Sequence, residues 1–375
     1  MKDLKQCRQE IDSIDEQLIA LFEKRMKICE DVVKYKMEHD LPIFQSEREK
    51  EVIGKNVNRI QEEQLKPYTQ LFVREMMNVS KSYQASFLPF ENVYPIKEPR
   101  YHDVVVGYPG VPGSFSCKAL EIYFGENVEK KNFEQFHDVF EALQNNEIDY
   151  GIVPLENSST GAIFDNYDAI RDYQFSIVGE QSLSISQHLL GIKGSCKEDI
   201  TRVYSHPQGL LQSSQFLSEN PHMKGEVCAN TALAAQYVAS QNNKHYGAIA
   251  SKEAAEVYGL EIIQDHINDL KNNATRFIVF SKELEYTPSS TCMSVVFSLT
   301  HEVGTLCQII QIIKNHQINM LRIESRPLKE TPWQYYFYVD FEGNLEDKNI
   351  IQALEEMKAY TKMLRVLGNY EKKES

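Results

Sequence analysis

The sequence is poor in the features that mark secreted, membrane-spanning or nucleic-acid-binding proteins. Its seven cysteines are scattered, odd in number and free of any C-x-x-C pair, which favours reduced thiols over disulfides or a zinc site. No apolar run approaches the length of a membrane span, and the charged N-terminal stretch predicts no signal peptide. The formal net charge of −14 leaves no basic excess for nucleic acid. We therefore expect a cytoplasmic protein in which any site for an anionic substrate is built from locally clustered Arg and Lys.

Glycine and proline are scarce in residues 1–86, which contain only Gly54, Pro42 and Pro67. This scarcity predicts an all-helical region with breaks at the two prolines. We expect a long first helix, a second helix from about Ser46 and a third from about Pro67. The full length of 375 residues leaves room for one or two further domains.

The first helix carries cations on a face that should be apolar. Three of the nine residues at 3/4 spacing are basic, and buried cations are costly unless they are paired. They indicate either salt bridges to glutamates such as Glu47, Glu49 or Glu51, or a pocket for a small polyanion. Since Arg8 and Arg25 are 17 residues apart, or about 25 Å of helix, one ligand could touch both only if Arg8 came from a second copy of the chain. The nine residues are Arg8, Ile11, Asp15, Leu18, Phe22, Arg25, Cys29, Val32 and Lys36.

Residues 1–86 resemble the all-helical chorismate mutase module. The resemblance rests on Arg8-x2-Ile11-x3-Asp15, Arg25, Lys36, Arg48-Glu49 and Ser80-x3-Gln84. It implies an intertwined dimer in which Lys36 and Gln84 donate to the ether oxygen of the substrate and Glu49 accepts from its hydroxyl. Where the family commonly has an aspartate before the Arg-Glu pair, this chain has Gln45. The implied substrate-binding residues are Arg8, Arg25, Arg48, Gln45 and Ser80.

Residues 87–101 carry three prolines without periodicity and are predicted to be a linker. From Asp103 the pattern alternates between strand and helix. The glycine-rich turn 107–113 is spaced G-x-x-G-x-x-G, unlike a dinucleotide fingerprint, and no Walker lysine follows, so a nucleotide cofactor is not expected. Ser114 is predicted to be an N-cap.

Five strand ends in this region are followed by hydroxyl or amide side chains, which predicts a polar cleft between two α/β lobes. The last of these junctions is Asn273-Ala274-Thr275-Arg276-Phe277, which lies at the start of a buried strand. There Arg276 offers a fork for a carboxylate and Thr275 a single donor. We interpret His206, in the third junction, as a structural loop residue.

Residues 102–282 resemble prephenate dehydratase. The matches are Gly110-x2-Gly113-Ser114-Phe115-Ser116, Pro154-Leu155-Glu156-Asn157-Ser158, Ser205-His206-Pro207-Gln208, Asn230-Thr231-Ala232 and Thr275-Arg276-Phe277. The resemblance implies two lobes like those of periplasmic binding proteins, with Thr275 as the key catalytic hydroxyl and Arg276 as a carboxylate anchor. The other implied substrate contacts are Ser114, Asn157, Ser158, Ser205, Gln212, Thr231 and Phe277.

Residues 291–370 are predicted to form strand, helix, strand, strand, helix and strand, an α+β module of ferredoxin-like βαββαβ type. The module resembles the ACT regulatory domain of the same enzymes. The resemblance implies a phenylalanine site between two such modules, formed by Gly304-Thr305-Leu306 and Glu324-Ser325-Arg326-Pro327. The alternative is a module that only dimerises.

Together these resemblances imply a multidomain, bifunctional chorismate mutase and prephenate dehydratase of phenylalanine biosynthesis, at least dimeric, with no metal or organic cofactor. Chorismate and prephenate would be its substrates and L-phenylalanine its effector. Two alternatives stay open. The cleft could take arogenate instead of prephenate, or the chain could be a two-lobed ligand sensor that has lost its chemistry.

Overall fold

The structure is a computed structural model that describes residues 3–39, 41, 46–87, 94, 96–270, 272–328 and 333–374. The chain falls into two compact units, and each is described by itself. The first comprises residues 1–93, 299–318 and 345–362. The second comprises residues 94–298, 319–344 and 363–375. The helices of the C-terminal module thus belong to the first unit and its strands to the second.

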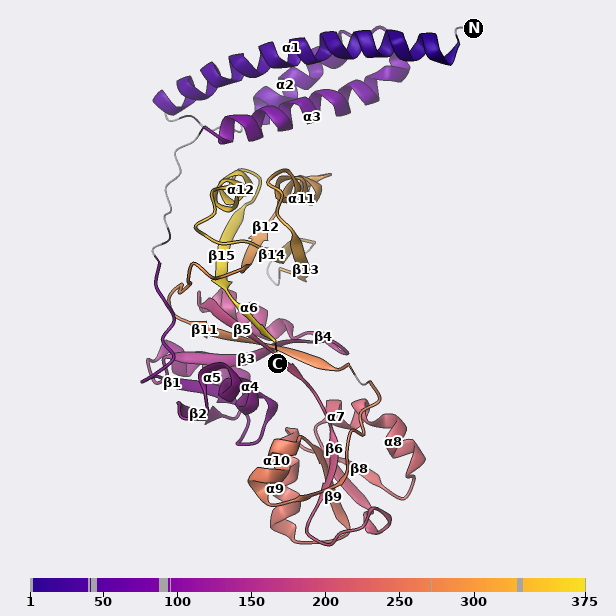
Figure 1. Ribbon diagram of the computed structural model, residues 1–375, viewed down its shortest axis with the longest axis vertical. Coiled ribbons are helices and arrows are strands. Elements are labelled where there is room, and N and C mark those ends of the chain that lie inside the picture. Colours follow the sequence, from indigo (N-terminus) through magenta and orange to yellow (C-terminus); the bar gives the residue numbers. More distant parts are fainter. Residues whose placement is uncertain are drawn as a thin grey trace. The chain divides into compact units, whose positions relative to one another are not determined.

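The N-terminal helices are those predicted from the scarcity of glycine and proline (Figure 1). They are α1 (Leu4–Glu38), α2 (Ser46–Val57) and α3 (Lys66–Ala85), with a short 3-10 turn (Glu63–Leu65) before α3. Asp3 caps α1 by accepting from the Gln6 amide at 2.8 Å. Two further helices, α11 (Thr305–Asn315) and α12 (Lys348–Lys358), complete this unit. Within the described ranges, no helix is both long enough and apolar enough to span a membrane.

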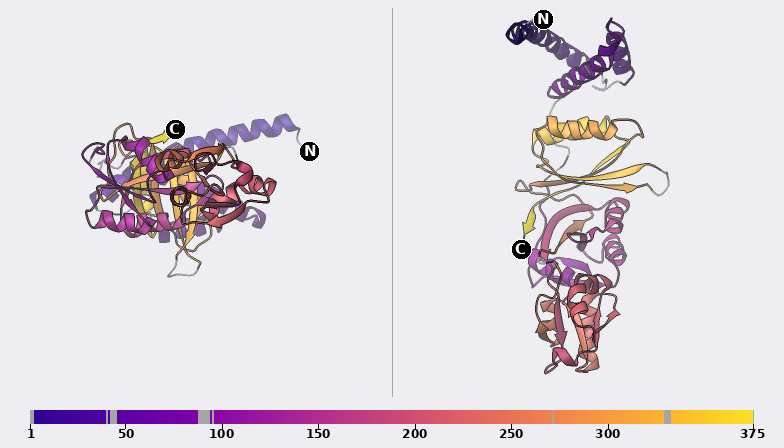
Figure 2. Two further views of the ribbon diagram at one scale, coloured as in Figure 1. Left: turned by 90° about the horizontal axis from the view of Figure 1, so that it is seen from below. Right: turned by 90° about the vertical axis from the view of Figure 1, so that its right-hand side faces the viewer.

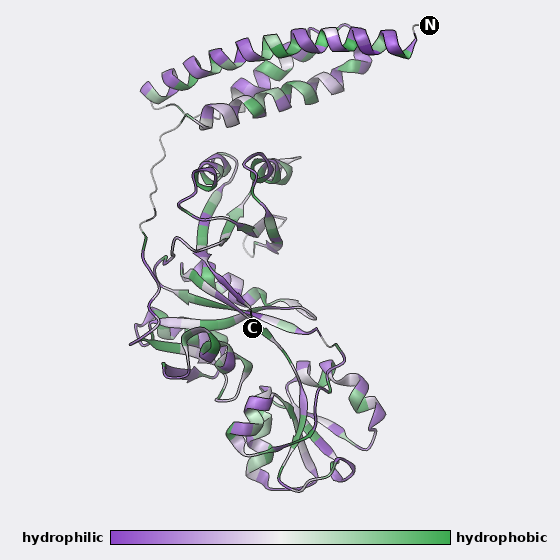
Figure 3. Ribbon diagram, in the orientation of Figure 1, coloured by the Kyte–Doolittle hydropathy of each residue, from purple (hydrophilic) through white to green (hydrophobic). Residues whose placement is uncertain are grey.

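Only part of α1 is buried within one chain. Met26, Cys29 and Val33 are its buried residues, and Val73 and Met77 are buried on α3. Most other large apolar side chains of α1 are exposed, and Figure 3 shows hydrophobic residues interspersed with hydrophilic ones along the whole helix. The exposed set comprises Leu4, Ile11, Ile14, Leu18, Ile19, Leu21, Phe22, Ile28, Val32, Tyr35 and Met37. A soluble helix rarely leaves so much apolar surface without a partner.

The second unit contains two sheets, which form separate lobes, and residues 185–187, 265–270 and 272–273 lie between them in the chain (Figures 1 and 2). The larger sheet has the order β13-β14-β12-β15-β5-β11-β3-β1-β2. Its dehydratase-like strands are β1 (Val105–Pro109), β2 (Glu129–Phe133), β3 (Tyr150–Asn157), β4 (Gly161–Ala162), β5 (Ser176–Ser184) and β11 (Ala274–Ser281). Helix α4 (Phe115–Phe124) contributes to one core cluster of this sheet, and α5 (Phe136–Gln144) and α6 (Phe164–Asp172) contribute to another.

The second lobe is a five-stranded sheet of order β10-β6-β9-β7-β8. Its strands are β6 (His188–Gly191), β7 (Arg202–Ser205), β8 (Lys224–Val227), β9 (Tyr246–Ala250) and β10 (Glu261–Gln264). Its helices are α7 (Pro207–Gln212), α8 (Ser214–Glu219), α9 (Thr231–Gln241) and α10 (Lys252–Tyr258). The two-lobed α/β arrangement predicted for this region is therefore present.

The C-terminal module has the predicted element order, strand, helix, strand, strand, helix and strand. Its strands are β12 (Cys292–Ser298), β13 (Met320–Pro327), β14 (Tyr335–Glu342) and β15 (Met363–Tyr370), and β16 (Lys372–Glu374) follows. The sequence did not predict that these strands continue the dehydratase sheet. They join it where Gly368 of β15 pairs with Ile177 of β5, and a Cβ on Gly368 would lie 2.1 Å from the Ile177 carbonyl oxygen.

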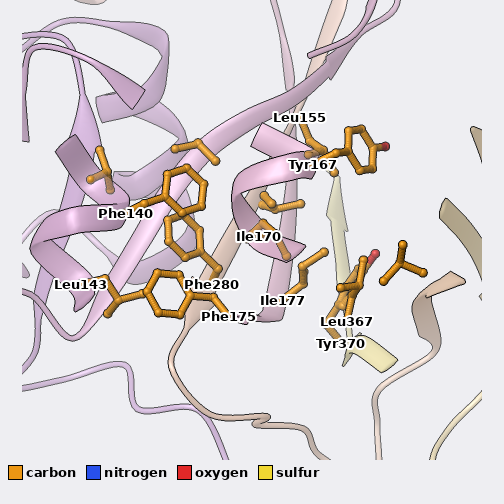
Figure 4. Packing of buried hydrophobic residues seen from close by; sticks show 14 of the residues in the cluster. Phe140, Leu143, Leu155, Tyr167, Ile170, Phe175, Ile177, Phe280, Leu367 and Tyr370 are labelled. Atoms are coloured by element: carbon orange, nitrogen blue, oxygen red, sulfur yellow. The ribbon is translucent and has the colours of Figure 1, made fainter. Parts of the chain in front are cut away.

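One hydrophobic core extends through this junction. Phe140, Phe175 and Phe280 stack in the first lobe, with 4.5 Å between the ring centroids of Phe140 and Phe280. The same cluster includes Leu367 and Tyr370 of β15, as Figure 4 shows. Because packed interiors transmit small shifts, the strands of the C-terminal module are mechanically continuous with those of the first lobe.

Candidate active sites

A cleft of about 610 Å³ lies between the two lobes of the second unit. In the first lobe its walls come from the C-terminal ends of β1 and β3 and from the start of β11. In the second lobe they come from α7 and from the start of α9. Among the described residues that line it, none is lysine or arginine, and the titratable ones are Glu134 and His206. The cleft therefore offers neutral donors and backbone amides to an anionic ligand.

Thr275 stands at the head of β11, 8% exposed and facing the cleft. It pairs across the sheet with Asn157 of β3, whose Nδ2 donates to Thr275 Oγ1 at 2.9 Å. The backbone amides of Ser159 and Thr160 donate to Asn157 Oδ1 at 3.0 and 3.3 Å, which fixes the orientation of the side-chain amide. Since Thr275 Oγ1 accepts from Asn157, its own proton is left to donate into the cleft.

Helices α4 and α9 both begin at the cleft with a side-chain cap. Ser114 caps α4 by accepting from the Cys117 amide at 3.3 Å, and Asn230 caps α9 by accepting from the Leu233 amide at 2.7 Å. Ser114 and Thr231 both line the cleft, as predicted, although Asn230 is the cap of α9. The positive ends of two helix dipoles therefore favour a carboxylate where no side-chain cation is present.

Side chains of the second lobe reach across to the first. Gln208 Nε2 donates to Thr160 Oγ1 at 2.7 Å, and Gln212 Nε2 donates to Ser159 Oγ at 3.3 Å. His206 caps α7 through Nδ1, which accepts from the Gln208 amide at 3.2 Å. Burial lowers the pKa of His206, so its imidazole is neutral near pH 7. The structural role expected for His206 fits this geometry, although the ring also lines the cleft.

Three residues that the sequence assigned to substrate are not among those lining the cleft. Ser205 is fully buried and donates to the Ile249 carbonyl at 2.7 Å. Ser158 Oγ accepts from the Ala274 amide at 3.0 Å, which ties the loop after β3 to the start of β11. Arg276 points to the other side of its strand because successive strand residues face opposite ways. Asn157, Gln212 and Phe277 do line the cleft.

Sequence reasoning missed several residues that line the cleft. Gln208 belongs to the quoted Ser205-His206-Pro207-Gln208 motif, and Thr160 belongs to the polar run after β3, so both carried a signal that was not used. Gln187 carried none, because it lies in an irregular segment between the lobes. Its position is set by the tertiary fold.

The second polar group lies among α1, α2 and α3. Arg25 of α1 donates to Ser80 of α3, and Glu49 of α2 pairs with Lys81 Nζ at 2.7 Å. Gln84 is buried and donates to the Ser80 carbonyl at 3.2 Å. Lys81 was missed, although it directly follows Ser80 in the quoted motif.

Lys36 is partly buried beside these groups. Burial lowers its pKa from the ordinary lysine value, while the nearby charges of Cys29 and Glu49 act in the opposite direction. A lysine with such surroundings is poised to donate to a bound anion. In this group Arg25 of α1 donates to Ser80 and Glu49 pairs with Lys81 of α3, so several donors from two helices lie close together.

The remaining predicted mutase residues lie apart from this group or outside the described residues. Arg8 is exposed on α1, and Arg48 pairs with Glu51 at 2.7 Å on the exposed side of α2. Gln45 lies outside the described residues. Because Arg8 and Arg25 lie 17 residues apart along the same helix, Arg8 cannot reach the group around Arg25 in its own chain.

The predicted effector residues divide between the two units. Gly304, with φ of +88°, is the N-cap of α11, and Thr305 and Leu306 begin that helix. Glu324, Ser325, Arg326 and Pro327 lie on β13. Arg326 Nη2 pairs with Asp168 at 3.1 Å, and its guanidinium lies 4.9 Å from the Phe164 ring centroid, so it already has partners in the first lobe.

Comparison with known proteins identifies both regions. The family model for prephenate dehydratase matches residues 106–285, and that for type II chorismate mutase matches residues 7–85. A bifunctional chorismate mutase/prephenate dehydratase of Aquifex aeolicus (strain VF5) is 32% identical over 99% of both chains. Arogenate dehydratase 2 of Petunia hybrida is 37% identical over 71% of both chains.

A solved structure of similar fold is the prephenate dehydratase of Arthrobacter aurescens in complex with L-Phe. It is 26% identical, with a TM-score of 0.65, over 71% of this chain and 89% of that one. Full-length similarity to the Aquifex protein joins both matched regions in one family. The chain belongs to the bifunctional chorismate mutase/prephenate dehydratases.

Proposed function

We propose that the chain converts chorismate to prephenate in its helical region and prephenate to phenylpyruvate in the cleft between the lobes. The observation that carries the second assignment is the Asn157–Thr275 pair at the head of β11, set in a cleft without lysine or arginine among its described lining residues. The first rests on the cation-bearing group formed around Arg25, Lys36 and Glu49.

In the dehydratase reaction the ring loses a hydroxyl and a carboxylate and becomes aromatic. The electron pair of the breaking bond to the carboxylate enters the ring as carbon dioxide leaves, and the hydroxyl departs with its own bonding pair as hydroxide, which takes a proton from solvent to become water. Thr275 donates a hydrogen bond to the departing hydroxyl, and the bond from Asn157 polarises the Thr275 hydroxyl for that purpose.

The absence of side-chain cations from the described cleft lining suits this reaction. A cation bound to the departing carboxylate would stabilise the negative charge that must be lost, and so would oppose decarboxylation. The carboxylate that remains in the product is held by the amides at the starts of α4 and α9, near Ser114 and Thr231.

In the mutase reaction one molecule rearranges, so the protein needs only to hold the reactive conformer and stabilise charge on the breaking ether bond. Arg25 binds one carboxylate, and Arg8 of a second copy binds the other. Lys36 and Gln84 donate to the ether oxygen, and Glu49, held by Lys81, accepts from the hydroxyl. Ser80, Arg48 and Gln45 complete the proposed substrate contacts.

A homodimer would complete this site. Arg8 lies in the same stretch of α1 as the exposed Ile11 (55%) and Leu18 (46%), which one chain leaves in water. Packing of this face against a second copy would bury the apolar residues and bring Arg8 to the partner's site.

Phenylalanine would act through the C-terminal module, which we assign as an ACT domain. The amides at Gly304 could bind its carboxylate, Glu324 its ammonium group and Leu306 its ring, with Thr305, Ser325, Arg326 and Pro327 nearby in sequence. Support comes from the similar dehydratase that was solved in complex with L-Phe. The seven free thiols agree with a cytoplasmic location.

The test is ultraviolet detection of phenylpyruvate formed from chorismate, and separately from prephenate, with and without phenylalanine, together with detection of phenylalanine formed from arogenate. We expect turnover of both chorismate and prephenate, and a lower dehydratase rate at millimolar phenylalanine. Phenylalanine formed from arogenate alone would shift the assignment to arogenate, the substrate in the name of the petunia relative. Binding of prephenate without its consumption would indicate a sensor.

A further inference from the structure

Arg276 is adjacent to Thr275 yet belongs to a different environment. It is 7% exposed and does not line the cleft. Its Nε donates to Glu180 Oε2 of β5 at 2.6 Å, and its Nη2 lies 2.8 Å from Asp340 Oδ2 of β14 and 2.9 Å from the Tyr370 hydroxyl of β15. These contacts hold the pKa of Arg276 well above its ordinary value, although burial alone would lower it. The guanidinium thus joins β11 to two strands of the C-terminal module.

The network continues beyond these contacts. Ser294 of β12 donates to Asp340 Oδ1 at 2.5 Å, and the Ser294 and Tyr370 hydroxyls are 2.7 Å apart. Arg322 of β13 lies 3.8 Å from Asp340 Oδ2 and pairs with Glu156 of β3. All four strands of the C-terminal module therefore contribute a side chain to one buried cluster.

The catalytic pair and this cluster occupy opposite sides of the same two strands. Thr275 pairs with Asn157 across β11 and β3, and their strand neighbours Arg276 and Glu156 also pair with each other. Thr275 and Asn157 face the cleft, whereas Arg276 and Glu156 are held by Asp340 and Arg322. A shift of the cluster would move Thr275 through its neighbour Arg276, and Asn157 through its neighbour Glu156, which Arg322 links to Asp340.

The ladder between β11 and β3 is irregular at this point. The register of β11 on β3 shifts between Arg276 and Phe277, where Phe277 pairs with Pro154 and Leu155 is left over as a bulge, whereas the pairing of β11 with β5 is unbroken from Ala274 to Val279. The bulge interrupts the regular ladder on the β3 side, next to Glu156, so there the side-chain contacts add precision to the pairing. Buried ion pairs of strict geometry can supply that precision even where they add little stability.

We propose that Arg276 is a positioning residue, not a substrate anchor, and that the Glu180–Arg276–Asp340–Tyr370–Ser294 cluster couples the Thr275–Asn157 pair to the strands of the C-terminal module. The inference rests on the proposed function insofar as Thr275 acts on prephenate. It adds the physical link through which a change in the module reaches the catalytic hydroxyl. It also explains why a guanidinium so close to the reacting group does not oppose loss of a carboxylate.

Three variants weaken the cluster to different degrees and so test whether it positions Thr275 and Asn157. Tyr370→Phe removes one hydroxyl, Asp340→Asn removes one charge at constant size, and Arg276→Lys keeps the charge but cannot make all three contacts. The matched control is Arg365→Lys. Arg365 also joins β15 to the first lobe, where its Nη2 donates to the Phe175 carbonyl at 2.6 Å, but it makes no contact with this cluster.

The readouts are kcat and KM for prephenate, with the mutase rate of the same preparation as a measure of folded protein. For Asp340→Asn and Arg276→Lys we expect kcat to fall roughly 10- to 100-fold, as for a displaced catalytic group, while KM changes little. Tyr370→Phe should show a smaller fall of the same kind. Arg365→Lys should keep the wild-type kcat, and the concentration of phenylalanine that halves the rate should change in the cluster variants but not in this control.

Other results would overturn the proposal. An increase in KM at constant kcat for Arg276→Lys, with Asp340→Asn and Tyr370→Phe unchanged, would make Arg276 a substrate contact. Equal losses in Arg365→Lys and the cluster variants would indicate general weakening of the sheet. Failure of the proposed function is a separate result, since the wild-type chain would then not consume prephenate at all.

Discussion

The helical region and the two-lobed cleft differ in the number of cationic side chains that they offer to a substrate. The helical group contains Lys36 and Lys81 close to Glu49, and Arg25 bonded to Ser80, whereas the described cleft lining contains neither lysine nor arginine. The difference follows the chemistry proposed for each. A rearrangement keeps both carboxylates of its substrate, so cations can hold them throughout, but a decarboxylation must release one of them. The cleft therefore relies on neutral donors and helix starts.

The two regions also differ in how complete they are within one chain. The cleft is closed by contacts between its own lobes, such as Gln208 to Thr160. Within one chain, the helical region leaves many of the large apolar side chains of α1 exposed. The cleft is thus formed within one chain, whereas the proposed mutase site takes Arg8 from a second copy.

The largest effect is expected for Lys36→Ala. Loss of the donor to the ether oxygen should remove about 3 kcal/mol of transition-state stabilisation, or roughly 100-fold in mutase rate, by analogy with an oxyanion donor. Chorismate consumption measures the loss, and prephenate consumption by the same protein is the control. A near-normal mutase rate would show that the cation group is not the mutase site.

Mixing two inactive chains tests whether the mutase site is shared. Arg8→Ala and Lys36→Ala chains, exchanged at random, should recover about a quarter of the wild-type mutase rate, since half the dimers are mixed and each has one intact site of two. The unmixed variants should stay inactive. Absence of any recovery after verified exchange would contradict a site shared between two chains, and an active unmixed Arg8→Ala chain would show that Arg8 has no role.

The substitution Asn157→Asp reverses the direction of the hydrogen bond between residue 157 and Thr275 without changing the size of the side chain. In Asn157→Asp the carboxylate would accept the Thr275 proton that the account assigns to the departing hydroxyl, and the dehydratase kcat should fall about 10- to 100-fold. Asn157→Ala removes the donor and should lower kcat by a similar or smaller factor. An active Asn157→Asp enzyme would show that Thr275 does not need its proton for prephenate.

A smaller effect separates the two activities by pH. Lys36 must be protonated to act, and burial lowers its pKa, so the mutase rate should fall at a pH below that of an ordinary lysine. The same shift makes the folded state bind fewer protons than the unfolded chain, so the contribution of Lys36 to stability improves as pH rises through the lowered pKa.

In the cleft, His206 is already neutral because its pKa is lowered, and the dehydratase rate should change less than about twofold between pH 7 and 9. Initial rates of both reactions across pH 7 to 10 provide the measurement. Parallel profiles would contradict the assignment of Lys36 to the mutase alone.

The sequence predicted what local patterns and motifs determine. The scarcity of glycine and proline before residue 87 predicted the three helices, and the run from Thr275 to Phe280 predicted a buried strand with its polar head at a cleft. Ser114 was recognised as a cap because its position before an apolar helix is a local signal.

The sequence could not predict on which side of a strand a motif residue is used. Thr275 and Arg276 are equally polar neighbours, and the sheet register and the bulge at Leu155 decide that only Thr275 faces the cleft. The C-terminal strands join the first lobe through the pairing of β15 and β16 with β5, which includes a close approach of Gly368 to Ile177. Partners such as Asp340 for Arg276 lie 64 residues away along the chain, and no local pattern relates them.

The most direct test of two separate sites in one chain is the Thr275→Ala variant, assayed for both reactions in one preparation. The account predicts that prephenate consumption is lost, because the donor to the departing hydroxyl is gone, while chorismate is still converted to prephenate at the wild-type rate. Prephenate would then accumulate. Retained formation of phenylpyruvate by Thr275→Ala would contradict the account, and so would equal loss of both activities in a folded protein.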